Sequence, residues 1–127
     1  TETTPLGKLL EPLSRPVVDG RRRYRALNPL AGADGTLLRS LAQGDFLLQG
    51  FRNRDLRLAL YGPAADATSV RRQSAAVTRQ LALLRAHGLI VKVQKTHRYQ
   101  LSAQGQRVTT ALLTAYAADV SKLAAAA

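Results

Sequence analysis

The fold is decided by residues 74–105, which read SAAVTRQLALLRAHGLIVKVQKTHRYQLSAQG. At about 100° of rotation per residue, the apolar side chains of the first half, and of the residues just before it, fall within about 60° of one another: Val70, Val77, Leu81 and Leu84. The opposite side would expose basic and small side chains: Arg71, Ala75, Thr78, Arg79 and Ala82. This pattern predicts a long helix that starts from a cap at Thr68 or Ser69 and ends at Gly88.

The second half of the stretch predicts a β-hairpin followed by a last helix. Residues 89–94 are rich in β-branched side chains, residues 95–97 form a tight basic turn, and residues 98–101 return as a second strand. Ser102 is the predicted N-cap of the last helix. Apolar residues recur in that helix at helical spacing before the chain ends in alanines: Val108, Leu112, Leu113, Tyr116 and Val120.

Three shorter elements are predicted before the long helix. Residues 37–41 lie in a helix that Asp34 or Thr36 can cap. The apolar run Phe46–Leu48, closed by a glycine, predicts a short strand. Asn53 is the predicted N-cap of a further short helix.

The N-terminal region predicts a short helix and a small basic hairpin. The helix covers Leu6–Leu13 and is stopped by Pro16, and the hairpin covers residues 17–25 around an Asp-Gly turn. The run Arg21–Arg23 has two interpretations. It is typical of a strand edge that charge keeps from aggregating, which we favour, and also of a patch for phosphate binding or nuclear localisation.

The predicted order of helix, short strand, helix, long helix, hairpin and helix resembles the winged-helix domain of MarR-like bacterial regulators. Residues 74–105 are similar to the family's recognition helix, its helix-ending Gly88-Leu89-Ile90, its wing, and the Leu101-Ser102 start of its last helix. The resemblance implies a mainly α-helical fold with a small β-hairpin (α+β), a winged helix-turn-helix. The chain then divides into an N-terminal helix and basic hairpin or arm (residues 1–32), a winged-helix domain (residues 33–124) and a frayed alanine tail (residues 125–127).

The resemblance also implies a set of contacts to duplex DNA on the long helix, the hairpin turn and the start of the preceding helix: Arg71, Arg72, Ser74, Ala75, Thr78, Arg79, Lys95, Thr96, His97, Arg98, Arg52, Asn53 and Arg54. Arg79 and Thr78 would read base edges, and the wing residues, together with Arg52, Arg54 and Arg57, would hold phosphates. Two alternatives are a solvated Arg79 and a Thr78 hydroxyl that bonds back to the preceding turn. His87 is predicted to cap the C-terminus of the long helix.

The charge of the chain favours the same partner. Nineteen Lys and Arg against eight Asp and Glu give a net charge of +11, and between Arg52 and Arg107 eleven basic residues face two acidic ones, a net +9. Basic charge on a patterned, folded region indicates an anionic partner. With no Trp and two Phe, the chain lacks the apolar face of a membrane-surface helix and the aromatic platforms of single-strand binders. Double-stranded DNA fits best.

Several function classes are disfavoured by composition. The chain has no Cys and two His, which removes disulfides and argues against a zinc site. No P-loop, acid and base pair or activated nucleophile is visible, so we expect no catalytic residues, no metal and no cofactor. Without a long apolar run or a signal pattern, the expected location is the bacterial cytoplasm, at the nucleoid when DNA is bound.

Alternatives to a transcriptional regulator are an RNA-binding winged helix, a DNA-binding module of a larger mobile-element or nucleic-acid-processing protein, and a winged helix that binds proteins. Residues 50–57 and 95–99 resemble the C-terminal segment of larger uncharacterised bacterial proteins, and the chain has no Met. MarR-like proteins dimerise through long terminal helices, whereas Pro12 and Pro16 interrupt the N-terminal helix here. A homodimer and attachment to other domains of a parent chain are therefore both kept as alternatives.

Overall fold

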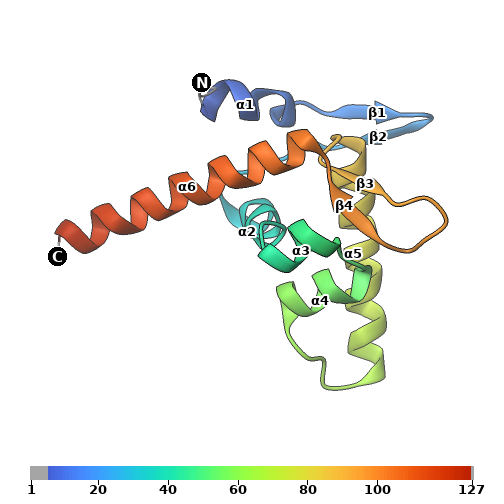
Figure 1. Cartoon of the computed structure of the whole chain (residues 1–127). Coiled ribbons are helices and arrows are strands. Elements are labelled where there is room, and N and C mark those ends of the chain that lie inside the picture. The colour runs from blue at the N-terminus through green and yellow to red at the C-terminus, as the bar shows by residue number, and fades with distance from the viewer. Residues whose placement is uncertain (1–5, 127) are drawn as a thin grey trace.

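The computed structural model describes residues 6–126, with the side chains of residues 6–118. In chain order the elements (Figure 1) are α1 (Leu6–Leu10), the 3-10 helix η1 (Glu11–Ser14), β1 (Val17–Asp19), β2 (Arg22–Tyr24), α2 (Gly32–Ser40), α3 (Gly44–Gln49), α4 (Asn53–Tyr61), α5 (Ala67–Ala86), β3 (Ile90–Lys92), β4 (Tyr99–Leu101) and α6 (Ala103–Ala126). The mainly helical α+β class is confirmed. Ala127, the end of the predicted alanine tail, lies outside the described residues.

Both strand pairs are antiparallel hairpins at the positions that the sequence predicts. The β1–β2 hairpin turns at Gly20, whose φ is 64°, and the β3–β4 hairpin pairs Lys92 with Tyr99. Phe51 adds a single bridge on the free side of β4: its N–H donates to the Tyr99 carbonyl at 2.9 Å, and the Tyr99 N–H donates back at 2.7 Å. The β3–β4 hairpin is thus tied to the segment that precedes α4.

The strand predicted at Phe46–Leu48 is wrong, because these residues form helix α3. Phe46 is buried, whereas Leu47 and Leu48 are 44% and 83% exposed, so the run does not alternate between two faces as a strand of a packed sheet would. Leu, which is not branched at Cβ, also favours helix over strand. The strand-like pairing falls instead on Phe51, after the turn at Gly50.

A single apolar core joins the helices to the β3–β4 hairpin. Of the stripe predicted on α5, Val77, Leu81 and Leu84 are buried and Val70 is half-buried. Leu83, outside that stripe, is buried as well. The long helix therefore has neighbours on more than one side.

Helix α6 begins on the core and then projects away from it (Figure 1). Its N-cap is Ser102, as predicted: the Ser102 hydroxyl accepts a hydrogen bond from the Gly105 N–H at 2.9 Å. Val108 and Leu112 are buried, but Leu113 and Tyr116 are 40% and 52% exposed. The predicted stripe thus packs only at its first residues, and the side chain of Val120 lies outside the described part.

Two glycines allow the β3–β4 hairpin to approach its neighbours closely. A Cβ at Gly105 would collide with the Leu89 carbonyl, so the start of α6 reaches the start of the hairpin only without a side chain there. Gly50 has φ 74°, and its Cβ would meet the Tyr99 carbonyl at 2.5 Å.

The N-terminal region shares the same core. The predicted helix Leu6–Leu13 is split into α1 and the 3-10 helix η1, with Pro at the start of η1. Leu10, Leu13 and Leu27 are buried, and the Leu27 N–H donates to the Leu13 carbonyl at 2.8 Å. The β1–β2 hairpin therefore leaves and rejoins the body at a fixed base.

Candidate nucleic-acid interface

Helix α5, with 20 residues, is the longest helix after α6. The cap predicted at Thr68 or Ser69 is wrong, since the N-cap is Asp66, whose carboxylate accepts a hydrogen bond from the Ser69 N–H at 2.7 Å. This hydrogen bond lowers the pKa of the Asp66 carboxyl below its usual value. His87 is the C-cap, as predicted. A carboxylate at the positive end of the helix dipole fixes where α5 begins.

One side of α5 is exposed and basic. Five of the residues predicted to contact DNA are exposed there: Arg71, Arg72, Ala75, Thr78 and Arg79. The sixth, Ser74, is half-buried. Arg79 lies near the middle of the helix with small Ala75 and Ala82 one turn to either side, so a partner can approach the backbone closely.

Hydrogen bonds between α4 and α5 occupy three of the predicted contact residues. The Asn53 side-chain amide donates to the Ser74 carbonyl at 3.1 Å and to the Thr78 hydroxyl at 3.0 Å. The Thr78 hydroxyl donates to the Ser74 carbonyl at 2.9 Å, which is the alternative of a bond back to the preceding turn. Asn53 is therefore not the N-cap of α4; that position is Arg52. These bonds fix the two helices relative to each other.

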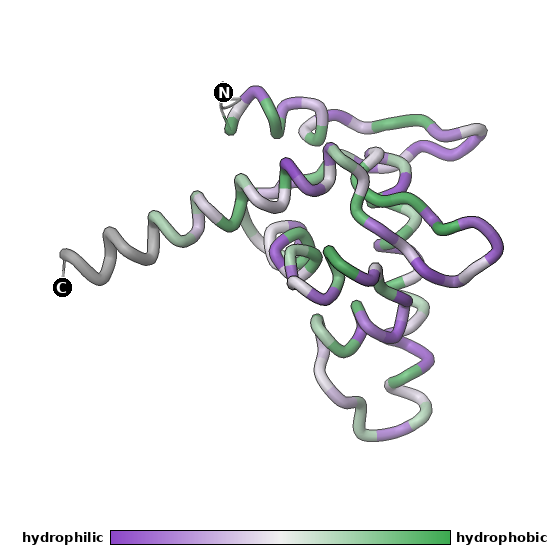
Figure 2. Tube along the Cα trace, viewed as in Figure 1, coloured by the Kyte–Doolittle hydropathy of each residue, from purple (hydrophilic) through white to green (hydrophobic). Residues whose placement is uncertain are grey.

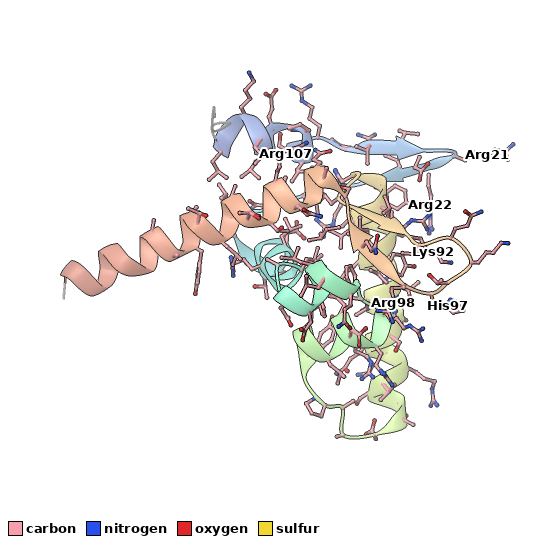
Figure 3. All side chains as sticks on the ribbon, in the orientation of Figure 1. Arg21, Arg22, Lys92, His97, Arg98 and Arg107 are labelled. Carbon is pink, nitrogen blue, oxygen red and sulfur yellow. The ribbon has the colours of Figure 1, made fainter. Side chains whose placement is uncertain are left out.

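The turn of the β3–β4 hairpin presents basic side chains on a closed loop. Thr96 closes it, because its hydroxyl donates to the Val93 carbonyl at 2.8 Å and accepts from the Arg98 N–H at 3.1 Å. Lys95, with φ 62°, and His97 are exposed at the turn. Figure 3 labels His97 there. Hydrophilic residues likewise occupy the turns of both hairpins in Figure 2.

Arg98 points back to the body and helps to line an open cleft. Its guanidinium donates to the Gln49 carbonyl at 2.8 Å. The cleft, about 550 Å³, lies between α3, the start of α4 and the hairpin: Asp45, Phe46, Gln49, Gly50, Arg52, Arg54, Asp55 and Arg98 line it. Within it, the Arg52 N–H donates to the Asp55 carboxylate at 2.8 Å. Arg52 and Arg54 are exposed and available to a phosphate.

Arg57 does not belong to this surface. The side chain is 8% exposed and its Nε has no hydrogen-bond partner among the described residues. The phosphate contact predicted for it is wrong, because a side chain this deeply buried is not open to a phosphate.

The β1–β2 hairpin lies beside α5, which the sequence did not indicate. A groove of about 450 Å³ separates the two, lined by Arg22, Arg23, Tyr24, Arg25, Ala76, Arg79, Gln80, Ala82 and Leu83. More than fifty positions separate the two walls in the chain, and no local pattern reports such a contact. The sequence left the run Arg21–Arg23 open between a strand edge and a phosphate-binding patch, and it did not place Arg22 and Arg23 beside α5.

The base of this hairpin is held by charge and hydrogen bonds. Both Nη atoms of Arg25 donate to the Asp34 carboxylate at 2.8 Å, and the Asn28 N–H donates to it at 2.9 Å. The Arg25 hydrogen bonds, more than any other contact, keep the pKa of Asp34 below its usual value although burial opposes them. Asp34 therefore does not cap α2, which begins at Gly32. The Nε2 atom of buried His87 lies 2.8 Å from the Arg25 carbonyl and donates to it.

Positive charge on this side of the molecule is largely uncompensated. Among the described side chains, ion pairs join only Arg15 to Glu11 and Arg25 to Asp34. The exposed basic residues of α5, the start of α4 and the β3–β4 turn therefore keep free guanidinium and ammonium groups. Such a surface attracts phosphate and other anions.

Within the described residues there is no group of three or more His, Cys, Asp or Glu side chains that could hold a metal ion. None of the described helices is both long enough and apolar enough to cross a membrane. Comparison of the chain with protein-family models, curated proteins and solved structures gives no significant match.

Proposed function

We propose that this chain binds double-stranded DNA as a winged helix-turn-helix, either as a transcriptional regulator or as the DNA-binding module of a longer protein. In this proposal α4 and α5 are the helix-turn-helix and the β3–β4 hairpin is the wing. The observation that carries the proposal is the exposed side of α5, where three arginines without an acidic partner among the described residues alternate with alanines.

The dimensions of α5 suit the major groove. Twenty residues at about 1.5 Å per residue make a rod of roughly 30 Å, and the groove is about 12 Å wide. Arg79 is the candidate for base reading, because a guanidinium can donate two hydrogen bonds to the O6 and N7 atoms of guanine. Thr78 instead holds α5 to α4, since its hydroxyl is already bonded on both sides.

In this proposal phosphate contacts come from the start of α4 and from the wing. Arg52 and Arg54 at the start of α4, and Lys92, Lys95 and His97 on the wing, are all exposed. Lys and Arg at such positions fix the register of a protein on the duplex but do not distinguish sequences. We therefore assign affinity to these residues and sequence preference to Arg79.

Two single substitutions test this division of roles on duplexes enriched from a random pool. Arg79→Ala should cost about 1 to 3 kcal/mol of binding free energy, about 5- to 150-fold in Kd, and should relax the preference at one base position. Lys95→Ala should weaken all sequences alike. Arg107→Ala, which removes one exposed charge from α6 away from the proposed surface (Figure 3), is the matched control.

The results separate the proposal from its competitors. Equal losses on every sequence for Arg79→Ala and Lys95→Ala would remove base reading from Arg79. The lack of any enriched duplex, together with tighter binding to a structured RNA competitor, would replace the DNA proposal with an RNA-binding one.

A further inference from the structure

The groove between the β1–β2 hairpin and α5 is a second concentration of positive charge. Its walls carry four guanidinium groups, those of Arg22, Arg23, Arg25 and Arg79, and no carboxylate lines it. Arg25 is neutralised by Asp34, but the other three have no ion pair with a described residue. On the α5 side Ala76 and Ala82 leave room for a bulky occupant. A groove of this charge and shape suits a polyanionic chain.

The groove is preformed because the hairpin is held at its base. The Arg25 and Asp34 ion pair ties it to α2, and the hydrogen bond from His87 to the Arg25 carbonyl ties it to the last turn of α5. The Leu27 to Leu13 hydrogen bond holds the returning chain. A groove whose walls are already fixed loses little conformational entropy when it binds.

The hairpin and α4 lie on roughly opposite sides of α5. At about 100° per residue, Ser74 and Thr78, which bond to α4, are about 170° from Ala76 and Leu83, which line the groove. A helix in the major groove has one sugar-phosphate backbone on each side. When Arg52 and Arg54 at the start of α4 lie beside one sugar-phosphate backbone, the β1–β2 hairpin lies beside the other.

We propose that this groove binds the sugar-phosphate backbone of the DNA strand on the far side of α5 from α4, so that Arg22 and Arg23 act as a second, N-terminal wing. The inference rests on the proposed function, and it gives the run Arg21–Arg23 a role in phosphate binding. Both hairpins extend to the same side of the molecule, to the right of α5 in Figures 1 and 3, as a duplex held between them requires.

The test compares two double variants of the full chain that lose the same charge. Arg22→Ala/Arg23→Ala removes the groove arginines, and Lys8→Ala/Arg107→Ala removes two exposed charges from α1 and α6. Each lost phosphate contact lowers the slope of log K against log salt by about 0.9. Between about 50 and 200 mM salt, the affinity of the wild type should therefore fall about 12-fold more than that of the groove variant. The affinity of the control variant should fall as much as that of the wild type. Arg22→Lys/Arg23→Lys keeps the charge and should restore most of the slope.

Hydroxyl-radical footprinting gives the second readout. The groove variant should lose protection on one strand beside the major groove entered by α5, while protection by the wing persists. If the groove variant matches the control in slope and footprint while Arg79→Ala and Lys95→Ala still weaken binding, this inference fails and the proposed function stands. If wild type shows no salt-dependent duplex binding, the proposed function fails and takes the inference with it. A groove-variant defect confined to structured RNA would also overturn the inference.

Discussion

The two hairpins have strands of equal length but differ in how they are attached to the body. Each consists of two antiparallel three-residue strands with basic residues at or near its turn, and each projects beyond α5 (Figure 1). The β3–β4 hairpin is fastened by fully buried apolar side chains, whereas the β1–β2 hairpin, with only Tyr24 packed partly against the core, is fastened at its base by an ion pair and hydrogen bonds. Similar local structure can therefore depend on different solution conditions.

Aromatic packing attaches the β3–β4 hairpin. The ring centres of Phe51 and Tyr99 are 6.1 Å apart, and those of Phe46 and Phe51 are 5.1 Å apart. Ile90 and Leu101, opposite each other in the ladder, are both buried. Burial of this kind is insensitive to pH and salt, so the wing belongs to the same cooperative unit as the helices.

The strands of the β1–β2 hairpin contain no buried residue. Val18, for example, is 71% exposed. Besides Tyr24, its attachment rests on the Leu27 and His87 hydrogen bonds and on the Arg25–Asp34 ion pair. Protonation of the Asp34 carboxylate weakens the ion pair. At acidic pH, where the ion pair is lost, we expect this hairpin to open locally without unfolding the body.

The largest effect is predicted for Phe51→Ala. Phe51 is fully buried and carries both the aromatic stack and the bridge to β4, so its truncation should cost about 3–5 kcal/mol of unfolding free energy in urea denaturation. Val18→Ala in the other hairpin, as a control, should change stability by less than about 0.5 kcal/mol. A Phe51→Ala loss no larger than the Val18→Ala loss would contradict the proposed difference in attachment.

A smaller, pH-dependent effect is predicted at Asp34. Its native pKa lies below the ordinary 3.8, so the stabilisation by Arg25 is complete above that value and is lost as the pH falls from 3.8 through the lower native pKa. Arg25 is 61% exposed, so solvent screens the ion pair and its contribution to the attachment of the hairpin should be about 1–2 kcal/mol. Loss of the pair should therefore lower the exchange protection of the Leu27 and Asn28 amides by about 5- to 30-fold.

Hydrogen exchange, corrected for intrinsic rates, checks this prediction residue by residue. The Phe51 and Tyr99 amides should keep their protection over the same pH range, because no titrating group fastens the wing. In Asp34→Asn the Leu27 and Asn28 protection should already be low at neutral pH and should not change on acidification. Parallel loss at both hairpins would mean that they open as one unit.

The elements and the core could be predicted from the sequence where the pattern is local and repeated. Periodicity and turn residues determine such elements within a few positions of the chain. Examples are the stripe Val77, Leu81 and Leu84, the Ser102 cap and both hairpins. The N-caps of α2, α4 and α5 and the Phe46–Leu48 segment could not be predicted in this way. Several neighbouring Asp, Thr, Ser or Asn residues can each cap a helix, and a three-residue apolar run fits either structure.

The candidate interface was only partly predictable for a different reason. Exposure of Arg71 and Arg79 follows from the helix period, but the bonds of Asn53 and Thr78 and the burial of Arg57 depend on how α4 packs against the rest. The groove beside α5 depends on a contact between segments far apart in the chain. Such tertiary contacts leave no signature in one sequence.

The most direct test of the central claim is the salt dependence of wild-type binding to an enriched DNA duplex, followed by fluorescence anisotropy from about 50 to 200 mM salt. About six neutralised phosphates predict a slope of log K against log salt near −5. A slope near zero would contradict the account, because a surface with this much free positive charge cannot bind duplex DNA without releasing counterions.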